Sequence, residues 1–134
     1  MLEEIKAYWY NLKTEYENRY GDTFLSDFNQ SKKYLEQMQS YLQSKLEECP
    51  SNVDVVGTLA SVMLELRDGE AEYVEFLENF LDKFDNALDD KDKARIYTNI
   101  AFAEDYSRKS LEYLTKAEEL ESPFAETYTA LGLY

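Results

Sequence analysis

The chain has 134 residues and carries 28 acidic against 14 basic side chains, which gives a net charge of −14 at neutral pH. A negative field of this strength repels nucleic acids and anionic lipids, so we expect no nucleic acid and no membrane among its partners. Histidine is absent from the sequence. Its absence excludes imidazole bases, histidine-dependent serine and cysteine nucleophiles, and the usual histidine-containing zinc and haem sites.

Composition predicts an all-α protein in the cytoplasm. Hydrophobic residues make up 44% of the chain, whereas only 4 glycines and 2 prolines are available for the turns that many short strands would need. The single cysteine, Cys49, has no partner for an intramolecular disulfide, which agrees with a reducing compartment. The sequence starts without a signal-peptide pattern, and no apolar stretch approaches the ~20 residues of a membrane span.

The first two predicted helices span residues 2–20 and, starting at Phe24 or Asp27, residues up to 48. In the first helix apolar side chains recur at spacings of three and four: Leu2, Ile5, Trp9, Leu12 and Tyr16. Gly21 is suited to end the first helix, and Pro50 stops the second because it disfavours helical geometry in the residue before it.

The third and fourth predicted helices span residues 53–66 and 70–85, with a turn at Asp68 and Gly69 between them. The fourth is strongly amphipathic. Its apolar side, which includes Phe76 and Phe80, lies opposite three acidic residues that we expect to face solvent: Glu72, Glu75 and Glu78.

Three further helices are predicted in the remainder of the chain. The fifth begins near residue 90, where Asp89, Asp90 and Asp92 are the candidate N-caps, and the sixth begins at Asp105 or Ser107 and ends near residue 121. Pro123 interrupts the pattern and suits the first turn of a seventh helix over 124–134. We expect one domain, residues 1–134, built from helix pairs at about 2–48, 53–85 and 90–121 and a terminal helix.

The terminal helix leaves apolar residues without a later helix to cover them: Leu131, Leu133 and Tyr134. Three explanations are open. The chain associates with itself through this helix, or it is truncated at the C-terminus of a longer repeat protein, or the short helix simply caps the stack.

A local pattern recurs near the start of the third, fifth and seventh helices: a large residue, an apolar residue three positions later, and a small residue immediately after. The three occurrences are Val56, Leu59, Ala60; Tyr97, Ile100, Ala101; and Tyr128, Leu131, Gly132. Helices approach closely only where one side chain is small, so each occurrence predicts a packed helix hairpin.

At these residues the sequence resembles the tetratricopeptide repeat (TPR) family, whose helical unit begins with an aromatic, a leucine and a small residue and often follows a proline. Pro50 and Pro123 precede two of the occurrences, and the resemblance covers residues 53–134. It implies antiparallel helix hairpins stacked as a short TPR-like α-solenoid. An ordinary helical bundle is the alternative.

The resemblance also implies ligand-facing positions on the first helix of each pair. Mapped onto this chain they are Asp54, Thr58 and Ser61; Arg95, Asn99 and Phe102; and Glu126, Thr129 and Leu133. Asn99 stands out because its amide could hydrogen-bond the backbone of an extended peptide.

No catalytic or cofactor motif is evident. Cys49 has no activating neighbour in the sequence, the glycines occur singly rather than in a phosphate-binding loop, and the acids around 85–92 do not match a calcium loop. We therefore expect no enzyme, no cofactor and no metal.

Two functions remain open on this sequence. The first is a scaffold or adaptor that binds a peptide or a basic protein surface. The second is an acidic immunity or antitoxin protein that neutralises a basic enzyme. Residues 51–134 hold 19 acidic and 8 basic residues, so we expect a basic partner to be steered by this part of the chain, with Glu72, Glu75 and Glu78 contributing.

Overall fold

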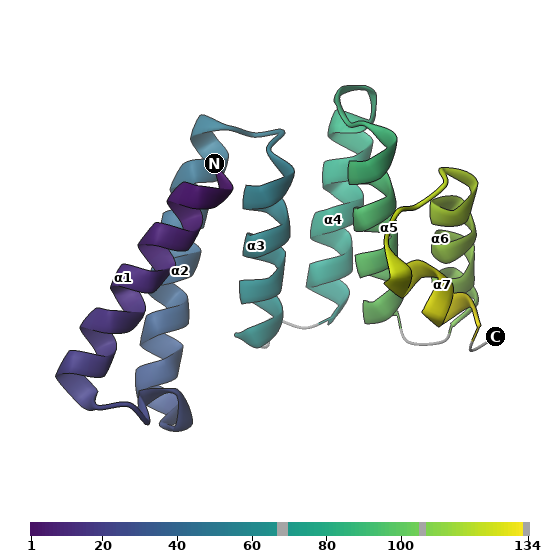
Figure 1. Cartoon of the computed structure of the whole chain (residues 1–134). Helices are drawn as coiled ribbons and strands as arrows, with labels where there is room; N and C mark the ends of the chain where they lie inside the picture. Colours follow the sequence, from purple (N-terminus) through teal and green to yellow (C-terminus); the bar gives the residue numbers. More distant parts are fainter. Residues whose placement is uncertain (67–69, 105–106, 133–134) are drawn as a thin grey trace. The chain divides into compact units, whose positions relative to one another are not determined.

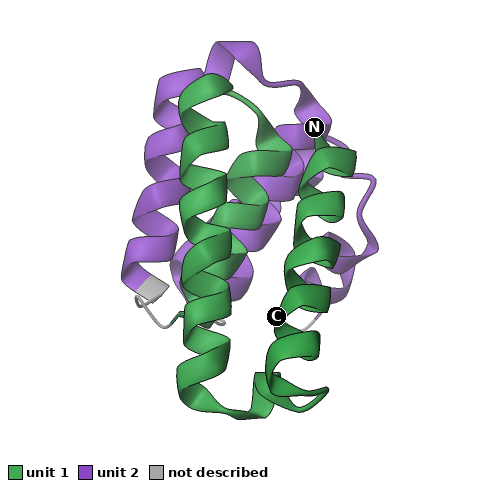
Figure 2. Ribbon diagram, turned by 90° about the vertical axis from the view of Figure 1, so that its left-hand side faces the viewer, with its two compact units in different colours: residues 1–68 green, residues 69–134 purple. Residues whose placement is uncertain are grey.

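The computed structural model describes residues 1–66, 70–104 and 107–132. Every regular element in these residues is helical, which confirms the all-α prediction. The chain divides into two compact units, residues 1–68 (unit 1) and 69–134 (unit 2), coloured separately in Figure 2. No helix of the described ranges combines the length and apolar character needed to cross a membrane.

Unit 1 contains α1 (Leu2–Tyr20), a 3-10 turn η1 (Phe24–Ser26), α2 (Phe28–Glu48) and α3 (Val53–Glu65). Successive α-helices run in opposite directions (Figure 1). Gly21 ends α1 with a φ of 91°, a backbone conformation that side chains with a Cβ disfavour. The Asp27 carboxylate accepts a hydrogen bond from the Gln30 N–H and so caps α2.

An aromatic cluster closes the α1–α2 end of unit 1. The ring of Phe24 lies 5.5 Å from that of Tyr16 and 5.1 Å from that of Tyr34, measured between centroids. All three residues are buried. Phe24 belongs to η1, and this turn places its ring in the core. For that reason α2 begins only at Phe28, later than either predicted start.

Unit 2 contains α4 (Glu70–Phe84), a 3-10 turn η2 (Asp85–Ala87), α5 (Asp90–Ala103), α6 (Arg108–Glu119) and the short α7 (Ala125–Leu131). Of the candidate N-caps of α5, Asp89 is the one that caps the helix, since it accepts a hydrogen bond from the Asp92 N–H, and Ser107 caps α6 by accepting from the Ser110 N–H. The predicted hairpin over 53–85 therefore has one helix in each unit. Whether the two units form the single domain expected from the sequence stays a prediction.

Small residues mark the close approach of α5 and α6. Ala101 is 2% exposed and packs with Leu114 and Ala130, while the Ser110 hydroxyl donates to the Ala101 carbonyl at 2.9 Å. The burial of Ala101, and of Ala60 in unit 1, agrees with the small position of the sequence pattern.

The third occurrence of that pattern is wrong for α7. Tyr128 is 44% exposed and Gly132 is exposed, whereas Thr127 and Ala130 are the buried residues of this helix. The buried face of α7 lies one residue earlier in the sequence than expected. The reason is that the Thr127 hydroxyl, and not the ring of Tyr128, is buried against the neighbouring helices. Leu133 and Tyr134 lie outside the described residues.

Three buried hydroxyls join α7 to α5. The Thr127 oxygen lies 2.7 Å from that of Thr98 and 2.8 Å from that of Ser122. Thr98 uses its single hydrogen to donate to the Ala94 carbonyl at 2.8 Å. Thr127 must then donate to Thr98, and Ser122 to Thr127, so the hydrogen-bond chain runs in one direction from Ser122 to Ala94.

Replacing the middle hydroxyl tests this chain. Thr127→Val leaves the buried Ser122 hydroxyl without its acceptor, so the free energy of unfolding should fall by about 1–3 kcal/mol in urea titrations. Thr129→Val is the matched control, because Thr129 is exposed on the same helix, and it should change stability by less than about 0.5 kcal/mol. Equal effects of the two substitutions would contradict the docking of α7 through Thr127.

Candidate functional site

Two adjoining hollows lie over α4 in unit 2. One, of about 310 Å³, is bounded by α4, α5 and α6 and is lined by Glu78, Leu81, Asp82, Asp85, Tyr97, Tyr113 and Lys116. The other, of about 360 Å³, is lined by Ala71, Val74, Glu75, Glu78, Asn79, Asp82, Glu104 and Lys109. Because both include Glu78 and Asp82, we treat them as one acidic groove, with five carboxylates and two ammonium groups along it.

The spacing of acids on α4 and η2 produces this groove. Glu75, Glu78, Asp82 and Asp85 follow one another at intervals of three, four and three residues, which places them along one side of the helix. Tyr73, Leu77 and Phe80 hold the opposite side in the core, and the buried side chains of Val74 and Leu81 form the apolar floor of the hollows beside the acids.

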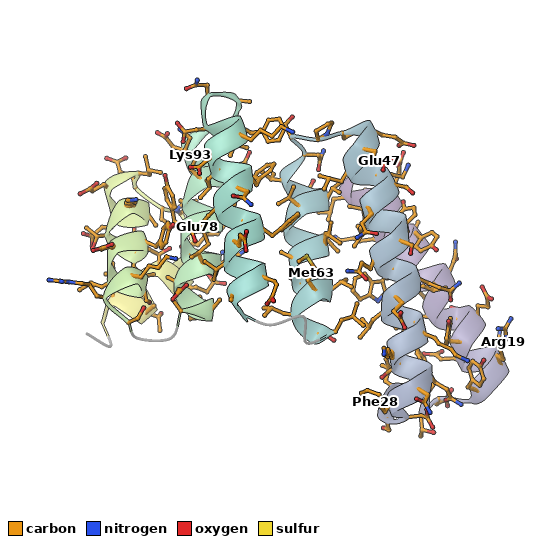
Figure 3. All side chains as sticks on the ribbon, turned by 180° about the vertical axis from the view of Figure 1, so that it is seen from behind. Arg19, Phe28, Glu47, Met63, Glu78 and Lys93 are labelled. Carbon is orange, nitrogen blue, oxygen red and sulfur yellow. The ribbon has the colours of Figure 1, made fainter. Side chains whose placement is uncertain are left out.

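Glu78 joins α4 to α6. Its carboxylate accepts a hydrogen bond from the Lys109 ammonium at 2.9 Å on one oxygen and from the Tyr113 hydroxyl at 2.7 Å on the other. Figure 3 labels Glu78 on the face where α4 is seen in front. Lys109 also lies 3.5 Å from a Glu104 carboxylate oxygen. Both partners of Glu78 come from α6, one turn apart, so the two helices are held together at this point.

The hydrogen bonds fix the protonation states of this cluster. Partial burial acts to raise the pKa of Glu78, but the hydrogen bonds from Tyr113 and Lys109 outweigh it and hold the pKa below the usual glutamate value. The bond to Glu78 raises the pKa of Lys109. Burial, and then the bond to Glu78, raises the pKa of Tyr113. At neutral pH the cluster is a carboxylate held by an ammonium and a neutral phenol.

Two tyrosines form the other end of the groove, which we call the tyrosine pocket, made of Tyr97, Tyr113, Asp82, Asp85 and Lys116. The Tyr97 and Tyr113 rings lie 5.7 Å apart at an interplanar angle of 32°. The Lys116 nitrogen lies over both rings, 5.8 Å and 5.1 Å from their centroids. The pocket therefore combines aromatic faces with carboxylates, an arrangement that suits cationic groups.

The predicted steering residues of α4 differ in their surroundings. Glu72 and Glu75 are exposed, as expected for a solvent face. Glu78 is only partly exposed and is ion-paired, because α6 supplies a lysine and a tyrosine at its position. The expectation that Glu78 simply faces solvent is therefore wrong.

A second set of predicted positions meets on α5 and α7. The Arg95 guanidinium lies 3.5 Å from the Glu126 carboxylate and stacks over the Phe124 ring, 3.8 Å from its centroid. Asn99 is partly buried on the next turn of α5, and Phe102 is 55% exposed. Thr129 is exposed on α7, and Leu133 falls outside the described residues.

The remaining predicted positions belong to α3 in unit 1. Thr58 donates a hydrogen bond to the Asp54 carbonyl at 2.7 Å, and Ser61 donates to the Gly57 carbonyl at 3.1 Å. Asp54 is partly buried and Ser61 is exposed. Both hydroxyls thus bond within their own helix.

Sequence reasoning missed the α6 side of the groove. Lys109, Tyr113 and Lys116 recur at spacings of four and three, which places them on one side of a helix. That spacing was a usable signal, but their pairing with Glu78 and Tyr97 depends on contacts between residues far apart in the chain.

Within the described ranges, no three histidine, cysteine or acidic side chains converge as a metal site. Comparisons of the chain with protein-family models, with curated proteins and with solved structures find no match.

The low pKa of Glu78 gives stability a pH dependence with a definite sign. The pKa of Glu78 in the folded state lies below the unfolded value of about 4.5. The ionised carboxylate therefore contributes its full stabilisation of the fold above that pH, and this stabilisation is lost as the pH falls through the folded-state pKa. Glu78→Gln should therefore lower the free energy of unfolding at pH 7 by about 0.5–1.5 kcal/mol, a modest figure because Glu78 is partly exposed. Below about pH 4 the difference from the original chain should shrink.

Glu75→Gln is the control for that series, since Glu75 is exposed on the same helix. It should change stability by less than about 0.5 kcal/mol at neutral pH. Denaturant titrations across pH 3–7 measure both. A Glu78→Gln difference that does not change over this range would show that Glu78 is not held as a stabilised carboxylate.

Proposed function

We propose that this protein is a non-catalytic interaction module that binds a basic segment of another protein in the acidic groove of unit 2. The observation that carries the proposal is the groove itself, in which exposed carboxylates of α4 adjoin a pair of tyrosine rings. Carboxylates attract lysine and arginine at a distance, and tyrosine faces add short-range contact with their charged ends and aliphatic stems.

The charge distribution supports a basic partner. Unit 2 holds 16 acidic and 7 basic residues, a net charge of −9, whereas unit 1 holds 12 and 7, a net charge of −5. Salt bridges inside unit 2 engage Glu78, Asp85, Glu104 and Glu126. Within the described residues no salt bridge engages Glu72, Glu75 or Asp82, so these carboxylates are available to a cationic ligand.

The protonation states of the groove suit recognition better than proton transfer. A general acid or base works best with a pKa near the operating pH, close to 7 in most cells. Here the pKa of Glu78 is displaced downward, and those of Lys109, Tyr97 and Tyr113 are displaced upward, all away from neutrality. Each group therefore keeps a fixed charge state, which gives a partner a constant electrostatic pattern.

We further propose that the helices form a TPR-like solenoid. The close approach at Ala101, the burial of Ala60 and the packing of α7 against α6 support this arrangement. An experimental structure tests it. If α3 and α4 form the predicted hairpin, one constant rotation and translation should carry it onto α5–α6, and helices that instead close around a shared central core would indicate an ordinary bundle.

Binding is tested with an array of short lysine- and arginine-containing peptides, each paired with a version in which these residues are glutamine. At least one basic peptide should bind the full chain. The triple variant Glu72→Lys, Glu75→Lys, Asp82→Lys should weaken that affinity at least about tenfold, because it reverses the charges that face the ligand.

A charge-matched control distinguishes an effect of the groove on affinity from an effect of the protein's net charge. Glu3→Lys, Asp22→Lys and Glu47→Lys change the same number of exposed charges in unit 1. At ~0.15 M salt, where screening acts over about 8 Å, they should alter affinity less than about threefold. Equal losses in the two triple variants, or equal binding of the glutamine peptides, would refute the proposal. If the bound partner is a basic enzyme that loses its catalytic activity in the complex, the same interaction serves to neutralise that enzyme.

A further inference from the structure

We infer that the tyrosine pocket is a binding site for one cationic side chain, a lysine or arginine of the partner, and that Lys116 occupies this site in the free protein. The inference rests on the proposed function, because it names the subsite within the acidic groove at which a basic segment would be anchored. It also makes Lys116 an intramolecular competitor of that ligand.

The geometry of the rings supplies the first argument. A cation is attracted to an aromatic face within about 6 Å of the ring centroid. The Lys116 nitrogen satisfies this condition for both rings at once, at 5.1 Å from Tyr113 and 5.8 Å from Tyr97. The chain's own ammonium thus marks the position at which these two faces hold a positive charge.

The position of Tyr113 is fixed independently of any ligand. Its hydroxyl donates to Glu78 at 2.7 Å, which anchors the far edge of the ring to α4. Tyr97 projects from α5, whose Ile96, Thr98 and Ile100 are buried. Two rings held on packed helices form a preorganised site, so little conformational freedom is lost when a cation binds between them.

The surrounding charges supply the second argument. Asp85 of the pocket is engaged by Lys93 at 3.3 Å, and Glu78, which lines the same hollow, is engaged by Lys109 at 2.9 Å. Asp82 is exposed and enters no salt bridge within the described residues, and the same holds for the Lys116 ammonium. Lys116 is therefore held by the ring faces and by electrostatic attraction to Glu78 rather than by a salt bridge. It can move away and leave Asp82 as the counter-charge for an incoming side chain.

The hollow is large enough for this exchange. Its volume of about 310 Å³ includes the space above the two rings, and pockets for small ligands begin near 300 Å³. When the resident group occupies the site for most of the time, the apparent dissociation constant of a competing ligand equals the intrinsic constant divided by the fraction of time for which the site is free. Removing the charge of Lys116 should therefore strengthen binding, although it removes a contact from the free protein.

The experiment uses single-residue probes and NMR of the tyrosine rings in the full chain. The cationic probes are N-acetyl-arginine methylamide and N-acetyl-lysine methylamide, and N-acetyl-norleucine methylamide is the uncharged control of similar length. The cationic probes should shift the ring signals of Tyr97 and Tyr113, and norleucine should not. Equal shifts from norleucine would overturn the inference, because binding would then be apolar.

Matched variants test the competition. Lys116→Met keeps a long aliphatic side chain without its charge and should tighten binding of the cationic probes at least about threefold. Lys91→Met removes one charge from an exposed position elsewhere in unit 2 and should tighten it less than about 1.5-fold, the effect of net charge alone. Equal gains in the two variants would refute the role of Lys116.

Substitution at Tyr97 tests the ring itself. Tyr97→Phe keeps an aromatic face and should retain binding, whereas Tyr97→Leu should abolish it, with backbone amide signals outside the pocket unchanged in both variants. Retention of binding by Tyr97→Leu would overturn the inference.

The outcomes also separate this inference from the proposed function. Basic peptides that respond to the reversal at Glu72, Glu75 and Asp82 but ignore Tyr97→Leu and Lys116→Met would leave the groove in place and refute the subsite. Probes that bind between the tyrosines while no basic peptide binds the chain would support the subsite and refute the proposed partner.

Discussion

The hydrogen-bonded contact of Glu78 with Lys109 and Tyr113 is the constraint on which the candidate surface depends. It joins α4 to α6 across 31 and 35 residues of sequence. Without it, a partly buried carboxylate on α4 would lack compensation for its lost hydration, and the ring of Tyr113 would have no fixed edge. The contact therefore ties α4 to α6, both of which also pack against α5, and it fixes the orientation of the ring that borders the tyrosine pocket.

The same contact explains how an acidic helix folds and still presents negative charge. Carboxylates spaced along one side of α4 repel one another, and that repulsion opposes folding. Lys109 neutralises Glu78, and Lys93 neutralises Asp85. Glu72, Glu75 and Asp82 keep their charges in the exposed part of the surface. Under the proposed function, structure and recognition thus draw on different carboxylates of one helix.

The predictable part of this protein is the part set by neighbouring residues. Helix periodicity, the glycine that ends α1 and the caps of α5 and α6 depend on residues within a turn or two of one another. The structure has Gly21 where the sequence places it, and it has Asp89 and Ser107 among the few positions that the sequence leaves open for the two helix starts. The burial of Ala60 and Ala101 was also predictable, because a small residue within an apolar face indicates a close helix contact.

The errors came from contacts between distant residues. The buried face of α7 follows the bond of Thr127 to Thr98, 29 residues earlier, and a threonine between Glu126 and Tyr128 gives no local sign of such a partner. The sequence pattern around Glu78 likewise matches that of its exposed neighbours on α4, and only its contacts with α6 distinguish it from them. The tyrosine pocket needed Tyr97 and Tyr113 to be brought together from two helices.

Intermolecular nuclear Overhauser effects from a bound basic peptide test the central claim most directly, because they locate the ligand on the chain. The account predicts contacts from one lysine or arginine side chain of the peptide to the rings of Tyr97 and Tyr113, with further peptide contacts along α4. Contacts confined to Phe102 and Thr129 on the α5–α7 side, or to unit 1, would contradict it.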